Sequence, residues 1–148
     1  MNLDRYNYQI SNDHQDYIFY SEGPKGKIKK IVRFSKIQDL ESTVYNLGFG
    51  DADDETGVVD DSVVTNNKDS SMVLATVANT VIDFTNYYGN QYIYATGSTP
   101  ARTRLYQIGI AGLWEKISID FEVYGLKEDS WHEFKKNVNY DAFLVRRK

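Results

Sequence analysis

The sequence predicts a single α+β domain over residues 1–148, with helices packed against a twisted, antiparallel-rich mixed sheet. Three observations support this fold class. The first half of the chain consists of short alternating segments separated by turn residues, which is typical of an antiparallel meander. The second half changes to the three- and four-residue apolar spacing of amphipathic helices. The chain also holds twelve tyrosines, which fall in strand-like runs and suit half-buried strand positions.

The N-terminal half predicts a β meander of short strands. Polar or glycine-containing turns separate the strands, among them Asn12-Asp13-His14-Gln15 and Gly23-Pro24. The third strand alternates except at Lys30-Ile31, which predicts a bulge. The basic stretch from Lys25 to Lys36 predicts the solvated face of an edge strand, with a polyanion-binding surface as the alternative. The predicted strands cover residues 6–10, 17–21, 27–34, 44–49 and 58–64.

The C-terminal half predicts the element order α-β-α-β-β. The first helix covers residues 70–88, and Asp69 or Ser70 can cap its N-terminus. The second helix begins at residue 100 and continues to about residue 117, and Gly109 and Gly112 predict a break into two short helices. The predicted strands of this half cover residues 91–95, 120–126 and 141–147.

Composition excludes several classes of function. The net charge of −4 argues against non-specific nucleic-acid binding, and specific nucleic-acid binding is not expected either. The absence of cysteine excludes disulfides, thiolate metal sites and cysteine nucleophiles. The first residues lack the apolar core of a signal peptide, and no apolar run approaches the ~20 residues that span a bilayer. We therefore expect a cytoplasmic protein that does not enter membranes.

The most informative segment runs from a predicted strand through a polar loop into the second predicted helix. Thr99 is a good N-cap and Pro100 occupies the first helical position. The unpaired N–H groups and the dipole at a helix N-terminus attract anions. The sequence therefore predicts an anion site, with a capped helix whose arginines pair with carboxylates as the alternative. The candidate ligand-binding residues are Thr96, Gly97, Ser98, Thr99, Arg102 and Arg104.

Arg102 and Arg104 are two residues apart on the predicted helix, so their side chains point in different directions. At most one of them is expected to face a bound anion. The segment lacks the glycine and lysine spacing of a Walker loop.

No catalytic constellation is found, and neither a metal nor a cofactor is expected. The acidic segment 51–61 does not fit an EF-hand, because its sixth and twelfth positions are Thr56 and Ser62. It predicts a solvated hairpin loop. His14 lies in a predicted turn, and His132 is followed by Glu133, which would point to the opposite face of a strand. Both histidines are predicted to be surface residues.

Several short motifs are shared with a known group of proteins. Over nearly its full length the chain resembles an uncharacterised bacterial family of similar size. That resemblance supplies a grouping and implies no activity. The motifs that carry it are SEGPKG (21–26), NLGFGD (46–51), LATVA (74–78), YATGST (94–99), RTRLY (102–106) and FEVYGL (121–126).

The last third of the chain is also similar to the end of GNAT acyltransferases. The similarity lies in residues 101–110, followed by a strand near residues 121–126. It implies a GNAT-like fold, in which a glycine-containing loop before the first long helix binds the pyrophosphate of CoA. Residues 65–71 of this chain, TNNKDSS, contain no glycine in that place. The usual cofactor site of that family is therefore expected to be absent.

The sequence favours a non-enzymatic cytoplasmic domain that binds a small anionic ligand or a protein partner. Two alternatives remain open. One is a degenerate GNAT-like acyltransferase or an enzyme that acts on a nucleotide, which requires an open polar cleft beside the strand 91–95. The other is a protein–protein interaction module that uses a tyrosine-rich face of the sheet, which requires an exposed apolar patch.

Overall fold

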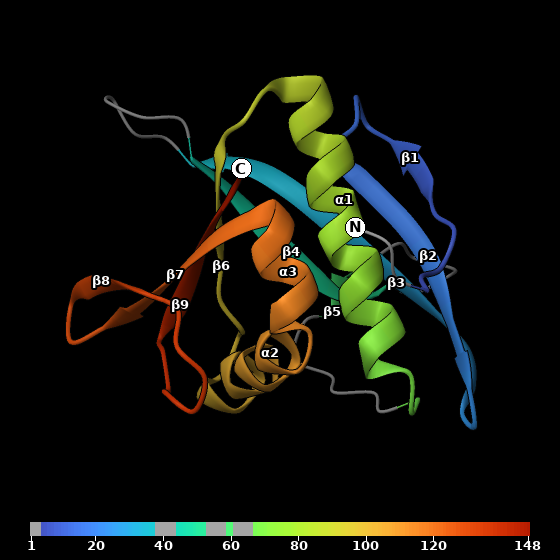
Figure 1. Cartoon of the computed structure of the whole chain (residues 1–148). Coiled ribbons are helices and arrows are strands. Elements are labelled where there is room, and N and C mark those ends of the chain that lie inside the picture. Colours follow the sequence, from blue (N-terminus) through green and yellow to red (C-terminus); the bar gives the residue numbers. More distant parts are fainter. Residues whose placement is uncertain (1–3, 38–43, 53–58, 61–66) are drawn as a thin grey trace.

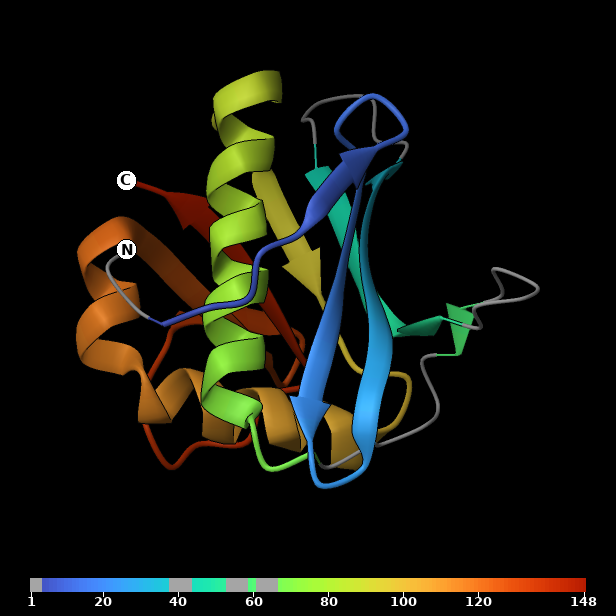
Figure 2. The same ribbon diagram turned by 90° about the vertical axis from the view of Figure 1, so that its right-hand side faces the viewer.

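The computed structural model describes residues 4–37, 44–52, 59–60 and 67–148. These residues form a twisted sheet with helices packed against it. This confirms the predicted α+β class. Helix α1 lies across the face formed by β2, β3 and β4 (Figures 1 and 2). In chain order the elements are β1 (Gln9–Ser11), β2 (Asp16–Gly23), β3 (Gly26–Ile37), β4 (Val44–Ala52), β5 (Val59–Asp60), α1 (Ser70–Tyr88), β6 (Tyr92–Ala95), α2 (Pro100–Gly112), α3 (Trp114–Asp120), β7 (Phe121–Lys127), β8 (Ser130–Glu133) and β9 (Ala142–Arg147).

The sheet is mixed and mostly antiparallel. Its strands follow the order β1-β2-β3-β4-β6-β9-β7-β8, and the short β5 pairs with the end of β4. The pairing of β4 with β6 is parallel and covers three residue pairs, from Val44 with Tyr92 to Asn46 with Tyr94. The other described pairings are antiparallel. Strand β9 therefore lies between β6 and β7, although it is the last of the described strands in the sequence.

Strand β3 corrects two predictions. It pairs with β2 and β4 in continuous register, so the bulge predicted at Lys30-Ile31 is wrong. It is also an interior strand, so its basic residues do not mark a sheet edge. Arg33 forms a bidentate ion pair with Asp16, at 2.9 and 3.2 Å. Lys30 is only 5% exposed and pairs with Asp51 of β4.

The core lies between α1 and the sheet and is rich in aromatic rings. The Phe84 ring of α1 is fully buried, and it stacks on Phe34 at a centroid distance of 4.2 Å. Tyr45 meets Phe84 edge-on at 4.8 Å. Ile93 of β6 is 1% exposed and belongs to the same cluster. The buried side chains of β3, β4 and β6 thus share one core with the helix.

Helix α1 is fixed to the sheet by hydroxyl groups. Asp69 occupies the predicted N-cap position but makes no side-chain cap hydrogen bond. Its carboxylate accepts hydrogen bonds from the Tyr6 hydroxyl at 2.6 Å and the Ser21 hydroxyl at 2.5 Å. Further along the helix, Asp83 accepts a hydrogen bond from the Tyr8 hydroxyl. Burial and the hydrogen bond to Asp83 raise the pKa of Tyr8 to about 12.

The C-terminal half follows the predicted order with two differences. The predicted helical break comes after Gly112, at Leu113, whereas Gly109 lies inside α2. A Cβ built on Gly109 would lie 3.0 Å from Leu74, so this glycine permits close packing of α2 on α1. Strand β8 was not predicted. It is joined to β7 by Glu128 and Asp129, which both have positive φ.

Of the predicted strand 58–64, only Val59 and Asp60 fall within the described residues, where they form β5. Most of the predicted acidic loop lies outside the described residues.

Candidate functional site

The junction between β6 and α2 begins the candidate site. Strand β6 ends at Ala95, and α2 begins at Pro100. The Thr99 side chain caps the helix, because its Oγ1 accepts a hydrogen bond from the Arg102 amide at 3.2 Å. The start of the helix is therefore built as the sequence predicts.

The loop before the helix is tied to the first helical turn. The Gly97 amide donates to the Thr103 hydroxyl at 3.0 Å, and that hydroxyl donates to the Thr99 carbonyl at 3.2 Å. A Cβ on Gly97 would lie 2.5 Å from the backbone nitrogen of Thr103, so only glycine allows this approach. The Gly97 amide thus has a protein partner and serves to fix the loop.

The residues directly before β9 form the opposite wall of the site. Because β6 and β9 are antiparallel and Ala95 pairs with Phe143, the residues after β6 lie beside those before β9. Thr96 Oγ1 donates to the Asp141 carbonyl at 2.9 Å. The ring of Tyr140 packs against Gly125, where an added Cβ would lie 2.2 Å from the ring. These contacts hold the wall in place.

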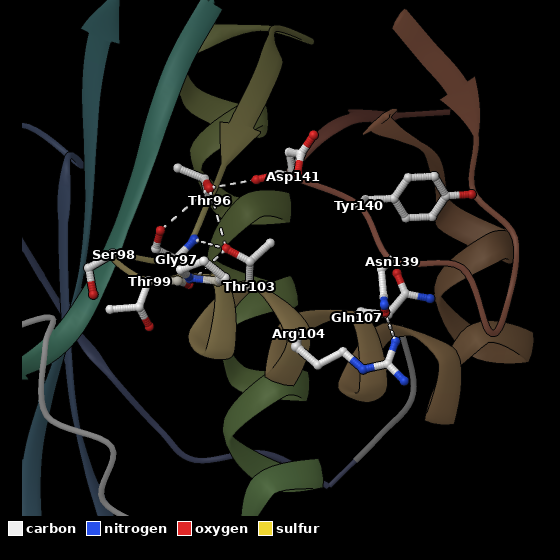
Figure 3. Close-up of a pocket in the computed structure, with 11 residues that line it drawn as sticks. Thr96, Gly97, Ser98, Thr99, Thr103, Arg104, Gln107, Asn139, Tyr140 and Asp141 are labelled. Atoms are coloured by element: carbon white, nitrogen blue, oxygen red, sulfur yellow. Dashed lines mark hydrogen bonds between the residues drawn. The ribbon is translucent and has the colours of Figure 1, made fainter. Parts of the chain in front are cut away.

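An open pocket of about 490 Å³ lies between these two walls and α2 (Figure 3). Five of the six predicted ligand-binding residues line it. Arg102 does not line it and is only 6% exposed. Arg102 and Arg104 therefore have different surroundings, as expected for positions two apart on a helix. The predicted residues that line the pocket are Thr96, Gly97, Ser98, Thr99 and Arg104.

The pocket offers hydrogen-bond donors at the helix start. Thr99 lines the pocket, and among the described residues its amide has no hydrogen-bond acceptor. Arg104 is exposed, and its Nη1 contacts Oδ1 of Asn139 on the opposite wall. A guanidinium has five N–H donors in a planar fork, so this single contact leaves others for a ligand. The donors lie where the helix dipole also favours negative charge.

The pocket has a mixed charge. Within the described part of the chain, its charged lining residues are Arg104 and Asp141. Figure 3 shows them at opposite ends of the pocket, with Asp141 beside Thr96 and Arg104 beside Asn139. The Arg104 end is therefore the end that suits an anion.

Gln107 is a pocket residue that the sequence analysis missed. It lies one turn after Arg104 on α2, and its side chain is 2% exposed. Its Nε2 donates to the Lys135 carbonyl at 3.3 Å. Its Oε1 is buried and has no hydrogen-bond partner among the described residues. Buried acceptors without partners are rare and costly in proteins.

The i, i+3 spacing from Arg104 could have identified Gln107 from the sequence, because such residues share a helix face. No local signal marks Asn139, Tyr140 or Asp141, since a strand pairing between distant segments brings them to the pocket.

The other residues considered in the sequence do not form a second site. His14 stacks on Tyr87 at a centroid distance of 3.9 Å, and His132 lies on the exposed strand β8. In residues 4–37, 44–52, 59–60 and 67–148, no group of three or more His, Asp or Glu side chains is placed to hold a metal ion. None of the described helices is long and apolar enough to cross a membrane.

Aromatic side chains gather on the face of β6 that is opposite to the buried Ile93. Tyr92 and Tyr94 alternate with Ile93 along the strand. Trp131 of β8 meets Tyr94 edge-on at 6.3 Å, and the Arg146 guanidinium lies 5.3 Å from the centre of the Tyr92 ring. We call Tyr92, Tyr94, Trp131 and Arg146 the aromatic face.

Comparison with known proteins yields one match. A sequence model described as "Family of unknown function (DUF6934)" matches residues 2–148, which is nearly the full length. No curated protein and no solved structure matches the chain. The predicted membership of an uncharacterised family is confirmed, whereas the similarity to GNAT acyltransferases stays a prediction.

Proposed function

We propose that the chain, which belongs to this family of unknown function, is a non-enzymatic domain that binds a small molecule through an anionic group of that molecule. The family description supplies no activity, so the proposal rests on the pocket. One observation carries the proposal: the start of α2 and Arg104 offer unused N–H donors to the same pocket. A carboxylate or a phosphate matches both kinds of donor. The bacterial cytoplasm remains the expected location.

Preorganisation supports this function. Thr103 and Gly97 hold the loop against α2 through the hydrogen bonds at 3.0 and 3.2 Å, so the donors are in position before a ligand arrives. A fixed site loses less conformational entropy on binding than a mobile one. Thr96 contributes by joining the loop to the wall before β9.

The first experiment is a binding panel of inorganic phosphate, sugar phosphates, nucleotides and short carboxylates, read as thermal shifts and by calorimetry. A ligand that binds only the folded protein raises its melting temperature. We expect Arg104→Ala to weaken binding of the active anion by about tenfold or more, because a charge-assisted hydrogen bond is lost.

The matched control is Arg147→Ala. Arg147 also donates to an asparagine side chain, that of Asn86, but it does not line the pocket. Its replacement should leave the affinity unchanged. Equal weakening in both variants, or no thermal shift with any anion, would contradict the proposed function.

A degenerate GNAT-like acyltransferase, or an enzyme acting on a nucleotide, is the second candidate. Its support is the short parallel pairing of β4 with β6, after which β4 continues to Ala52 and pairs with β5 instead. The two strands are therefore paired over only part of their length. The pocket, however, lies on the β9 side of β6 and includes no residue of β4. Acyl-CoAs in the same binding panel test this candidate.

A partner-binding module is the third candidate, and the aromatic face supports it. Trp131 is 42% exposed, and tyrosine, tryptophan and arginine are enriched at the centres of protein interfaces. A panel in which no small molecule shifts the melting temperature would favour this candidate over the other two.

A further inference from the structure

We infer that two copies of the chain associate face to face, through the aromatic face and the residues of β9 and β7 beside it. The two-fold axis lies between these two strands and runs parallel to them. Arg146 and Glu122 carry the inference, because they lie on the same side of the sheet and do not pair with each other. The association does not involve the ligand proposed for the pocket, so the two proposals are independent.

The strand register determines which side chains share this face. Strands β7 and β9 run side by side in antiparallel order (Figure 1). Because successive side chains of a strand point to opposite sides, every second residue pair belongs to the same face. Val123 and Val145 form a pair that faces the core, so the pairs on either side of it face outward. The outward pairs are Glu122 with Arg146, Tyr124 with Leu144, and Leu126 with Ala142.

The outer face is apolar but is not part of the core. Among the residues that the structure describes, none of its larger apolar side chains belongs to the core cluster or packs against it. Trp131 is 42% exposed, and the other large apolar side chains are only half-buried. An apolar sheet face of this kind is typical of a surface that another molecule covers. The half-buried side chains are Tyr92, Tyr94, Tyr124, Leu126 and Leu144.

The two opposite charges of this face are turned away from each other. Directly opposite residues of an antiparallel pair have Cβ atoms roughly 4.5–5.5 Å apart, which is close enough for an ion pair. The Arg146 guanidinium instead lies over the Tyr92 ring, 5.3 Å from its centre. The Glu122 carboxylate accepts a hydrogen bond from the Tyr124 hydroxyl at 3.2 Å. Within the described part of the chain neither charge has an ion-pair partner, so both are available to a second molecule.

A second copy of the chain supplies the complementary charges at the right positions. A two-fold interface joins the same patch of both copies, so every contact occurs twice. With the axis between β9 and β7, strand β9 of one copy faces β7 of the other. Arg146 then lies against the partner's Glu122, and Leu144 lies against the partner's Tyr124. Facing sheets pack about 10 Å apart, and their side chains fill the space between them.

A nucleic acid fits this face less well than a second copy. Glu133 is paired with Tyr124 in the register of β7 and β8, so it lies on the same face as Glu122. Two carboxylates beside a single arginine repel a phosphate backbone.

The first test is the oligomeric state of the full chain, measured by size-exclusion chromatography with light scattering and by sedimentation equilibrium. We expect the wild type to be a dimer. Leu144→Asp places a carboxylate in the interface and should weaken the dimer by about tenfold or more, because a buried charge without a partner is costly. The matched control is Leu105→Asp, since Leu105 is 48% exposed on α2 and lies outside this face. It should leave the dimer unchanged.

Charge reversal provides a second test, which a general loss of stability cannot imitate. In Arg146→Glu both positions are negative, and in Glu122→Arg both are positive. Each variant alone should dimerise about tenfold or more weakly than the wild type, because like charges then meet across the interface. Mixed in equal amounts, the two variants should form a heterodimer, because every charge then faces its opposite. Native mass spectrometry measures the heterodimer, and circular dichroism shows whether each variant is folded.

Three results would overturn the inference. A wild type that stays monomeric at the highest attainable concentration leaves this face to a different protein. A dimer that survives Leu144→Asp, or charge variants that do not associate when mixed, would show that the copies do not meet through this face. Should Leu144→Asp fail to fold, the mixing experiment decides. None of these results bears on the anion pocket, which the binding panel tests separately.

Discussion

At the scale of single residues, Gly97 determines how closely the loop after β6 approaches α2. Gly97→Ala would place a methyl group about 2.5 Å from the Thr103 backbone nitrogen, which cannot rotate away. We expect the free energy of unfolding to fall by about 1–3 kcal/mol, the usual cost of overpacking. The pocket should also lose affinity for its anion, because the loop moves away from the helix start. Urea denaturation and calorimetry measure the two effects.

Gly112→Ala is the control for this prediction. Gly112 is also a glycine of this region, but no atom lies within 4 Å of a Cβ built on it. Because it is helical, alanine should leave the stability unchanged or raise it by up to about 1 kcal/mol. Similar destabilisation by both substitutions would contradict the close-approach explanation.

Individual site residues differ in how well the sequence predicts them. Thr99 and Pro100 are predictable, since capping depends on side chains within one turn. Gln107 shares a helix face with Arg104 but was not identified, since its significance comes from burial and an unpaired atom. No local sequence pattern identifies Asn139 as a site residue. Only the β6–β9 register brings it opposite Arg104.

At the scale of elements, α1 depends on tyrosine hydroxyls for its attachment to the segment that precedes β1. Tyr6 bonds to Asp69 near the start of the helix, and Tyr8 bonds to Asp83 in its last third. Burial raises the pKa of both tyrosines in the folded chain. The attachment is therefore sensitive to alkali.

The pH dependence follows from the direction of these shifts. In the unfolded chain tyrosine loses its proton near pH 10, whereas Tyr8 keeps it to about pH 12 in the folded chain. Between these values the unfolded state binds fewer protons than the folded state, so stability decreases as the pH rises. The stabilisation is fully present below pH 10. We expect Tyr8→Phe to lower the stability at pH 8 and to make its decline between pH 9 and pH 11 shallower.

Urea denaturation across this pH range checks the prediction, with the wild type as reference. A smaller slope remains in the variant, because burial also raises the pKa of Tyr6, Tyr17, Tyr88 and Tyr124. Parallel stability curves for the wild type and Tyr8→Phe would show that Tyr8 does not titrate as inferred.

Most elements were predictable because their signals are local. The apolar spacing of α1 and the alternation of β2 and β3 repeat over several turns or residue pairs. Strand β8 has four exposed residues, so it shows no hydrophobic pattern. Gly109 was misjudged as a helix breaker, because its packing against Leu74 compensates for its low helix propensity.

At the scale of the whole molecule, one continuous sheet joins the two halves of the sequence. The core around Phe84 includes Phe34 and Tyr45 of the first half and Ile93 of the second. We expect both halves to unfold in a single cooperative transition, because neither can bury these side chains alone. Hydrogen exchange followed separately in peptides from β3, of the first half, and from α1, of the second, should give the same urea midpoint. Two separate midpoints would show that the halves unfold independently.

Strand order could not be predicted from the sequence. The meander β1–β4 is built from neighbouring strands, and that part was foreseen. The insertion of β9 between β6 and β7 depends on which edges remain open after the helices have packed. The residues of β9 alone therefore do not indicate which two strands it pairs with.

The central position of β9 has a consequence for synthesis on the ribosome. Strands β6 and β7 each present an open hydrogen-bonding edge until residues 142–147 have left the exit tunnel, because β9 supplies the partner for both. Until then, the nascent chain has two unpaired strand edges that can pair with strands of other chains. A delay in the emergence of residues 142–147 from the tunnel would prolong that exposure, whereas rapid emergence would protect the growing chain from association with its neighbours on the same messenger.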